Sequence, residues 1–171
     1  MSEDTVTSKR SELEQVLVRQ FKLLKDMNAL TIKERTALLN EPDAVLSVVE
    51  EKEALLDAMT LLEDRCRKIV QELSLLLGLH SENTSIQDLL PSFKPEDARL
   101  INHLSEGISS LASQAREANR ANQAIALTKL DWLKATQSFL ISLFLPDPGY
   151  QPQRNASSNK EAAGLGVEYR A

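Results

Sequence analysis

The sequence predicts an all-α protein: an elongated antiparallel bundle of three long helices, or of four if the first breaks, followed by a flexible tail. Apolar residues recur at spacings of three and four along most of the chain, which is the period of an α-helix. About half of the five glycines and six prolines fall after residue 145, so few helix breakers precede it. No stretch alternates apolar and polar residues for long enough to indicate a strand.

The composition argues against several classes of function. The net charge of −5 comes from interspersed acidic and basic residues without a basic, aromatic-rich patch, so we expect no DNA or RNA partner. The acidic start lacks a secretory hydrophobic region, and the longest apolar run, residues 139–145, is far shorter than the roughly 20 residues that span a bilayer. We therefore expect a soluble, cytoplasmic protein. We expect the single Cys66 to be a small buried hydrophobic residue.

We expect one helical-bundle domain over residues 1–145 and a flexible tail over residues 146–171. In the tail, prolines, glycines and serines replace the periodic apolar pattern. The first helix is predicted over about residues 8–40, because Ser8 or Ser11 can cap it and a leucine-rich face follows.

Two residues leave the continuity of this first helix open. Thr31 and Glu34 have the spacing of a capping box, in which each side chain bonds the other's backbone amide. The helix therefore either breaks near Thr31 and restarts, which gives a fourth helix, or runs unbroken to Asn40. Pro42 then ends this region and suits the first turn of the next helix.

The second helix, predicted over residues 43–77, has the most regular apolar spacing in the chain. Steps of three and four repeat as in a left-handed coiled coil, and Lys52 is the only charged residue on the seam. Gly78 is placed to close the helix in the left-handed conformation, with Leu79 as the hydrophobic contact. The seam consists of Val45, Val48, Lys52, Leu55, Met59, Leu62, Cys66, Ile69, Leu73 and Leu76.

A connector over residues 78–94 leads to the last predicted helix, residues 95–145. Within the connector, Ser85 and Asp88 have the spacing of another capping box, and the leucine pair after them can pin a single turn onto the bundle. The last helix would be roughly 75 Å long at about 1.5 Å per residue. Its seam consists of Ile101, Leu104, Ile108, Leu111, Ala115, Ala118 and Asn122, and continues at Ala126, Leu130, Leu133, Gln137 and Leu140.

The end of this last helix carries more apolar surface than its own bundle needs. On a helical wheel its apolar residues form two neighbouring stripes, whereas a surface helix usually needs one. The first stripe contains Leu133, Leu140 and Phe144, and the second contains Trp132, Phe139 and Leu143. We therefore predict a binding surface for another protein, made of Trp132, Phe139, Leu140, Leu143 and Phe144.

Amide residues interrupt the middle of the same helix. Asn119 and Asn122, the latter followed by Gln123, have a lower helix propensity than most of their neighbours. Because Asn122 falls in the seam, we predict that Asn119 and Asn122, with Lys52, fix the register of the bundle through buried hydrogen bonds. A direct role of these amides in binding a ligand is the alternative.

The sequence contains no group of residues that indicates catalysis. Neither histidine, His80 or His103, belongs to a Glu-x-x-His pair of the kind used by di-iron helical bundles. It has no glycine-rich phosphate loop, and no serine or cysteine nucleophile with a suggestively placed histidine. We therefore expect no enzymatic activity, no cofactor and no metal site.

The segment from Arg116 to Gln123 reads Arg-Glu-x-Asn-x-x-Asn-Gln on a long helix, and it resembles the FlgN family of flagellar type III export chaperones. A leucine-rich stretch and a Gly149-Tyr150 element follow, as in that family. The resemblance spans roughly residues 10–150, and its upstream elements are Lys52-x-x-Leu55-Leu56, Glu63-x-Arg65 and Leu77-Gly78-Leu79.

This resemblance implies a cytosolic chaperone for the hook-associated proteins of the hook–filament junction. In that family the C-terminal amphipathic region captures helical terminal segments of those proteins, prevents premature assembly and aids delivery to the export apparatus. We carry this role only onto residues 125–150, where the sequence itself shows surplus apolar surface. The resemblance thereby adds Tyr150 to the predicted client-binding residues. Contact with the export gate is implied as well, without a position in this chain.

Two other hypotheses use the same surface. A structural coiled-coil protein would self-associate through the end of the last helix and form a homo-oligomer without a client. Interfacial membrane binding by residues 132–145 is the weaker hypothesis, because the polar face carries Lys134 but few other basic residues.

Overall fold

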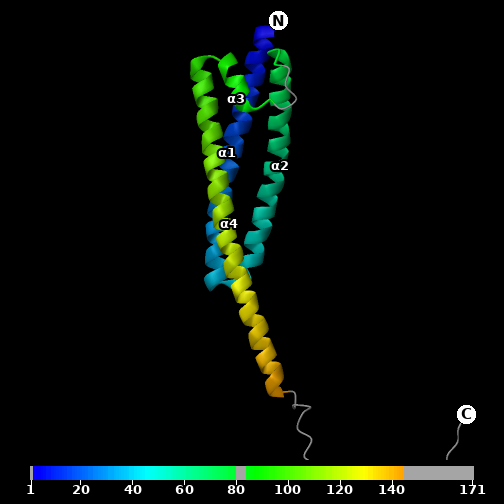
Figure 1. The fold of residues 1–171 in the computed structure, drawn as a ribbon, viewed down its shortest axis with the longest axis vertical. Helices are drawn as coiled ribbons and strands as arrows, with labels where there is room; N and C mark the ends of the chain where they lie inside the picture. Colours follow the sequence, from blue (N-terminus) through cyan, green and yellow to red (C-terminus); the bar gives the residue numbers. More distant parts are fainter. Residues whose placement is uncertain (1, 80–83, 145–171) are drawn as a thin grey trace, which may run out of the picture. The chain divides into compact units, whose positions relative to one another are not determined.

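The computed structural model describes residues 2–79 and 84–144, and most of them are α-helical (Figure 1). No strand occurs in these ranges, so the prediction of an all-α protein with three long helices is confirmed. The predicted tail, residues 146–171, lies outside the described residues. The helices are α1 (Ser2–Asn40), η1 (Pro42–Ala44), α2 (Val45–Leu76), α3 (Ile86–Leu89), η2 (Leu90–Ser92) and α4 (Pro95–Phe144), where η marks a 3-10 helix.

The chain divides after Asp131 into two compact units, and α4 contributes residues to both. In the first unit, α2 runs antiparallel to α1 and to the part of α4 that lies in this unit (Figure 1). Ion pairs between α1 and α2 follow this direction, because Lys9 near the start of α1 contacts Glu72, whereas Glu34 near its end contacts Lys52.

Contacts between α1 and α4 show that these two helices run in the same direction. Asn28 donates a hydrogen bond to the carbonyl of Leu111, and Lys129 donates one to the carbonyl of Leu39, both at 3.2 Å. The chain reverses direction once before α2 and once after it, which leaves α1 and α4 parallel.

The first helix begins at Ser2, earlier than the start at Ser8 or Ser11 that the sequence predicts. Val6 packs against the hydrophobic core, and Lys9 and Arg10 form ion pairs with α2 and α4. These tertiary contacts hold the additional residues in the helix, so neither serine acts as its cap.

The first helix also continues unbroken through Thr31, so the three-helix alternative is the correct one. The Thr31 hydroxyl donates to the carbonyl of Met27, one turn earlier, at 2.8 Å. The carboxylate of Glu34 accepts hydrogen bonds from Lys52 and Asn122 on the other two long helices. Both side chains of the apparent capping box therefore serve other contacts, which removes the reason for a break.

The end of α2 has the predicted glycine cap. Gly78 has a φ of 71°, the left-handed conformation that favours glycine. The N–H of Leu79 donates to the carbonyl of Ser74 at 2.9 Å, and the N–H of Gly78 donates to that of Leu75 at 3.2 Å. This pair of bonds is the Schellman motif, and it satisfies carbonyls that the helix end would leave free.

The connector contains the predicted capping box. The backbone N–H and the hydroxyl of Ser85 both donate to Oδ2 of Asp88, at 2.8 and 2.7 Å, and α3 begins at the next residue. Leu89, at the end of α3, is fully buried and holds this single turn on the bundle.

The main hydrophobic core lies where α3 meets the three long helices. Close approach of α1 and α4 near this core depends on Gly107, because a Cβ there would lie only 2.7 Å from the ring of Phe21. Within residues 2–79 and 84–144, no helix combines the length and the hydropathy needed to traverse a membrane. The buried core residues are Leu13, Val16, Leu17, Cys66, Ile69, Val70, Leu73, Leu89 and Ile101.

Candidate functional site

The last part of α4, residues 132–144, exposes nearly all of its side chains, and we call this segment the apolar end. Trp132 is 66 % exposed, Phe139 is 61 % exposed and Phe144 is 82 % exposed. Leu140 and Leu143 are exposed as well. Large apolar side chains gathered on a surface mark an interaction site more often than those scattered singly. Five of the six predicted binding residues therefore lie in solvent, and Tyr150 lies outside the described residues.

Two of the three hydroxyl groups of the apolar end, those of Thr136 and Ser142, are used within the helix. Thr136 donates to the carbonyl of Trp132 at 2.9 Å, and Ser142 donates to the carbonyl of Phe139 at 2.7 Å. The protons of these two hydroxyl groups are therefore not free for a partner. One side of the helix presents Leu133, Thr136, Gln137, Leu140, Ile141 and Phe144.

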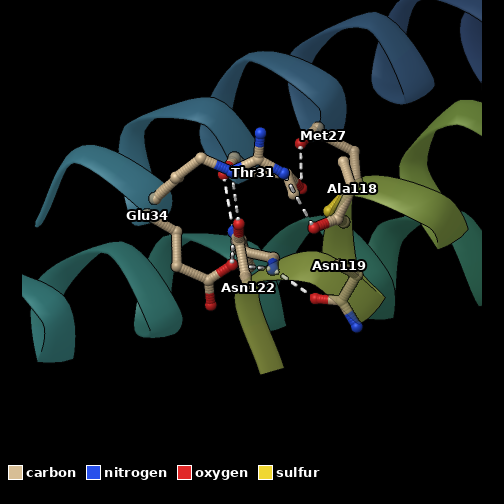
Figure 2. Close-up of polar contacts among 8 residues, drawn as sticks. Met27, Thr31, Glu34, Ala118, Asn119 and Asn122 are labelled. Carbon is tan, nitrogen blue, oxygen red and sulfur yellow. Dashed lines mark hydrogen bonds and ion pairs between the residues drawn. The ribbon is translucent and has the colours of Figure 1, made fainter. Parts of the chain in front are cut away.

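A second group of residues is polar, and it lies between α1, α2 and α4 in the first unit (Figure 2). The amide nitrogen Nδ2 of Asn122 donates to Oε2 of Glu34 and to the carbonyl of Thr31, both at 2.7 Å. The same Oε2 of Glu34 accepts a hydrogen bond from Nζ of Lys52 at 2.7 Å. We call this group the polar cluster, and it consists of Thr31, Glu34, Arg35, Lys52, Asn119 and Asn122.

Hydrogen bonds fix both ends of the Asn122 amide, whose residue is only 2 % exposed. Nε of Arg35 donates to Oδ1 of Asn122 at 3.0 Å, and Nη2 of Arg35 donates to the carbonyl of Ala118 at 3.4 Å. Lys52 completes the cluster by donating to Oδ1 of Asn119 at 2.9 Å. A buried charge is tolerated when it is paired and hydrogen-bonded, as Lys52 is here.

The structure brings the three predicted seam residues, Lys52, Asn119 and Asn122, into this one cluster. The sequence does not predict Glu34 and Arg35 as members of this cluster, because the spacing of Thr31 and Glu34 indicates a capping box and no pattern marks Arg35. The signal that would have found Glu34 is Lys52 itself. A lysine on a buried seam requires an acidic partner on a facing helix, since an unpaired buried charge is strongly unfavourable.

Solvent-facing ion pairs shift the pKa values of two residues near the start of α1. Hydrogen bonds from Arg65 and then from Lys9 lower the pKa of Glu12. Hydrogen bonds to Glu72 and then to Glu12 raise the pKa of Lys9. In the connector, hydrogen bonds from the side chain and the backbone of Ser85 lower the pKa of Asp88.

Cys66 is buried in the core, as the seam predicts. Burial, and secondly the negative charge of Glu63, raise the pKa of its thiol. A thiol with a raised pKa is a poor nucleophile at neutral pH. Among the residues described, no three or more His, Cys, Asp or Glu side chains are grouped so that they could hold a metal ion.

A helical bundle with an exposed apolar helix end has the features of a protein that binds other proteins. The family model FlgN protein matches residues 1–158, and the chain therefore belongs to the FlgN family. This is a family of flagellar export chaperones for hook-associated proteins, and it is not a family of enzymes. Comparison with curated proteins and with solved structures gives no match.

Proposed function

We propose that this protein is a cytoplasmic chaperone that binds helical terminal segments of hook-associated proteins through the apolar end of α4. Binding covers segments that would otherwise assemble too early, and the complex is delivered to the type III export apparatus. The proposed contact residues are Trp132, Phe139, Leu140, Leu143, Phe144 and Tyr150.

The exposure of the apolar end is the observation that carries this proposal. Phe144 is 82 % exposed, and its neighbours on both apolar stripes also face solvent. An amphipathic helix of a client would cover them by placing its own apolar residues at spacings of three and four against α4. Family membership supplies the class of client, because this family serves hook-associated proteins.

The energetics favour a chaperone helix that is formed before binding. Burying a leucine or phenylalanine side chain contributes about 1.5–3 kcal/mol, whereas ordering one residue of backbone costs about 1–2 kcal/mol. Residues 132–144 are already helical, so only the client segment has to become ordered. A few anchor residues therefore suffice for an affinity that still permits release at the export apparatus.

Two charge substitutions in the apolar end test the proposal. The full chain carrying Phe139→Glu and Phe144→Glu is compared with the wild type by calorimetric titration of a purified hook-associated protein. We expect the affinity to fall at least about a hundredfold, because two anchors of about 1.5 kcal/mol or more are lost. An affinity within threefold of wild type would show that the site lies elsewhere.

A matched variant controls for added charge. Leu46 and Leu61 on α2 are 68 % and 72 % exposed, comparable with the two phenylalanines. The variant Leu46→Glu with Leu61→Glu adds the same charge to the first unit, and we expect it to bind the client like the wild type. An equal loss in both variants would point to a general effect of charge and would contradict the proposal.

Self-association through the apolar end is the competing hypothesis. Sedimentation of the full chain over a range of concentrations, with and without purified client, distinguishes the two. A chaperone surface has to become available to the client, so we expect client to replace the contacts between chains. An oligomer that keeps the apolar end buried when client is present would favour a structural coiled coil.

A further inference from the structure

An open hollow of about 350 Å³ lies beside the polar cluster, between α1, α2 and α4 of the first unit. Its volume is at the lower end of the range for ligand sites. Met27, Leu56 and Ala115 contribute apolar walls, while Lys52, Glu34 and Asn119 contribute polar atoms. The hollow thus joins an apolar surface to a set of fixed hydrogen-bonding groups, which is the composition of a binding site.

Hydrogen-bonding capacity remains unused on the polar side of the hollow. Lys52 is only 9 % exposed, and its ammonium has three donors, of which Glu34 and Asn119 take two. The amide nitrogen of Asn119 and Oε1 of Glu34 have no hydrogen-bond partner among the described residues. One N–H of Lys52, two N–H groups of Asn119 and one acceptor oxygen of Glu34 are therefore available to an occupant.

The charges at this position favour a neutral occupant. Glu34 and Lys52 form an ion pair at 2.7 Å. The lining also contains Glu53 and Arg116, so its acidic and basic residues are equal in number and the site has no excess charge to neutralise. A carboxylate would meet the carboxylate of Glu34, and an ammonium group would meet that of Lys52. A hydroxyl group fits both, because it accepts from Lys52 or Asn119 and donates to Glu34.

The residues that line the hollow favour an occupant whose apolar part is an aromatic ring. Met27 and Arg116 both line the hollow, and a thioether and a guanidinium group both interact favourably with aromatic rings. We propose that the hollow binds a tyrosine side chain that projects from a partner protein. The phenol hydroxyl bonds the polar cluster, and the ring packs between Met27 and Leu56.

This proposed site explains Asn119 better than a purely structural role does. Asn122 directs both ends of its amide to groups inside the bundle, whereas Asn119 uses only its oxygen there. Figure 2 shows the Asn119 amide with its oxygen toward the cluster and its nitrogen turned away. The site is separate from the apolar end, so it does not depend on the proposed client surface.

The side chain of tyrosine can be tested as a free molecule. Isotope-labelled full chain is titrated with p-cresol, and with toluene as the analogue without a hydroxyl, while amide NMR signals are recorded. We expect p-cresol to shift the side-chain amide signal of Asn119 and to bind about tenfold more tightly than toluene, because the hydroxyl bonds a charged group. No shift at Asn119, or equal binding of both probes, would overturn the proposal.

Two variants locate the binding within the hollow. Ala115→Leu fills it and should weaken p-cresol binding at least tenfold, while Ala124→Leu, at an exposed position on the same helix, should leave binding unchanged. If Ala115→Leu disturbs folding, as thermal unfolding by circular dichroism would show, Leu56→Ala removes an apolar wall from a side chain that is 54 % exposed. Binding that survives in a folded variant of either kind would contradict the proposal.

Discussion

The two parts of α4 reverse the usual distribution of polar and apolar side chains. In the first unit α4 buries Asn122, which is 2 % exposed, and in the second unit it exposes Phe144, which is 82 % exposed. Each arrangement is unfavourable by itself, since a buried amide requires partners and an exposed aromatic ring orders water. The difference between them is that the partners of Asn122 are within this chain, whereas those of Phe144 are not among the described residues.

The polar cluster restricts how the three helices can pack. An apolar seam with steps of three and four permits neighbouring helices to shift along one another at modest cost, because one leucine can replace another. Asn122 forms hydrogen bonds with Thr31, Glu34 and Arg35, and a shift of α4 along α1 would break them. We propose that the cluster thereby favours one register of the bundle, a task in which the apolar end of α4 has no part.

The largest effect should follow from breaking the buried ion pair. Lys52→Met leaves the carboxylate of Glu34 without its charge partner, and both side chains are largely buried. We expect the free energy of unfolding to fall by about 3–5 kcal/mol, measured by urea denaturation with circular dichroism. Adding Glu34→Gln should restore much of the loss, because the neutral amide needs no cation. A loss below about 1 kcal/mol would show that this pair contributes no more to stability than an exposed ion pair does. The contrast between a buried polar cluster and an exposed apolar end would then have no energetic basis.

The sequence predicted the architecture well because periodicity and breakers are local signals. Helix α2 closes at Gly78 and α3 begins after Ser85, as their spacings predict. The buried cysteine also follows from the seam alone. In these cases the residue pattern within a few turns carries the required information.

Tertiary contacts account for what the sequence did not predict. Thr31 and Glu34 have the spacing of a capping box, but both side chains have other partners. Thr31 bonds the carbonyl of Met27 on its own helix, and Glu34 bonds Asn122 on α4. Helix α1 begins at Ser2, before the predicted start at Ser8 or Ser11, because Val6 packs against the core. The sequence did not predict that Glu34 and Arg35 belong to the polar cluster. A single sequence shows which residues lie on a seam, but it does not show which residues on other helices face them.

Surface ion pairs should have a smaller and more screened effect than the buried pair. The pKa of Glu12 is lowered in the folded state by Arg65 and Lys9, so its contribution is present above the pKa of the unfolded chain and is lost as pH falls through the folded value. Glu12→Gln should therefore lower stability slightly at pH 7 and match the wild type at strongly acidic pH. Urea denaturation across this range, repeated in added salt, measures both effects. A variant difference that grows on acidification would contradict the assignment.

The smallest effect on stability should come from the most conspicuous apolar residues. Phe139→Ser and Phe144→Ser remove side chains that are 61 % and 82 % exposed, and surface substitutions usually change the free energy of unfolding by no more than about 0.5 kcal/mol. Leu17→Ala, at a position that is 2 % exposed, provides the contrast and should cost about 2–5 kcal/mol. If the two serine variants destabilised the chain as Leu17→Ala does, the apolar end would be packing within its own chain. The comparison would then fail, because the same side chains would have no surface left to offer a client.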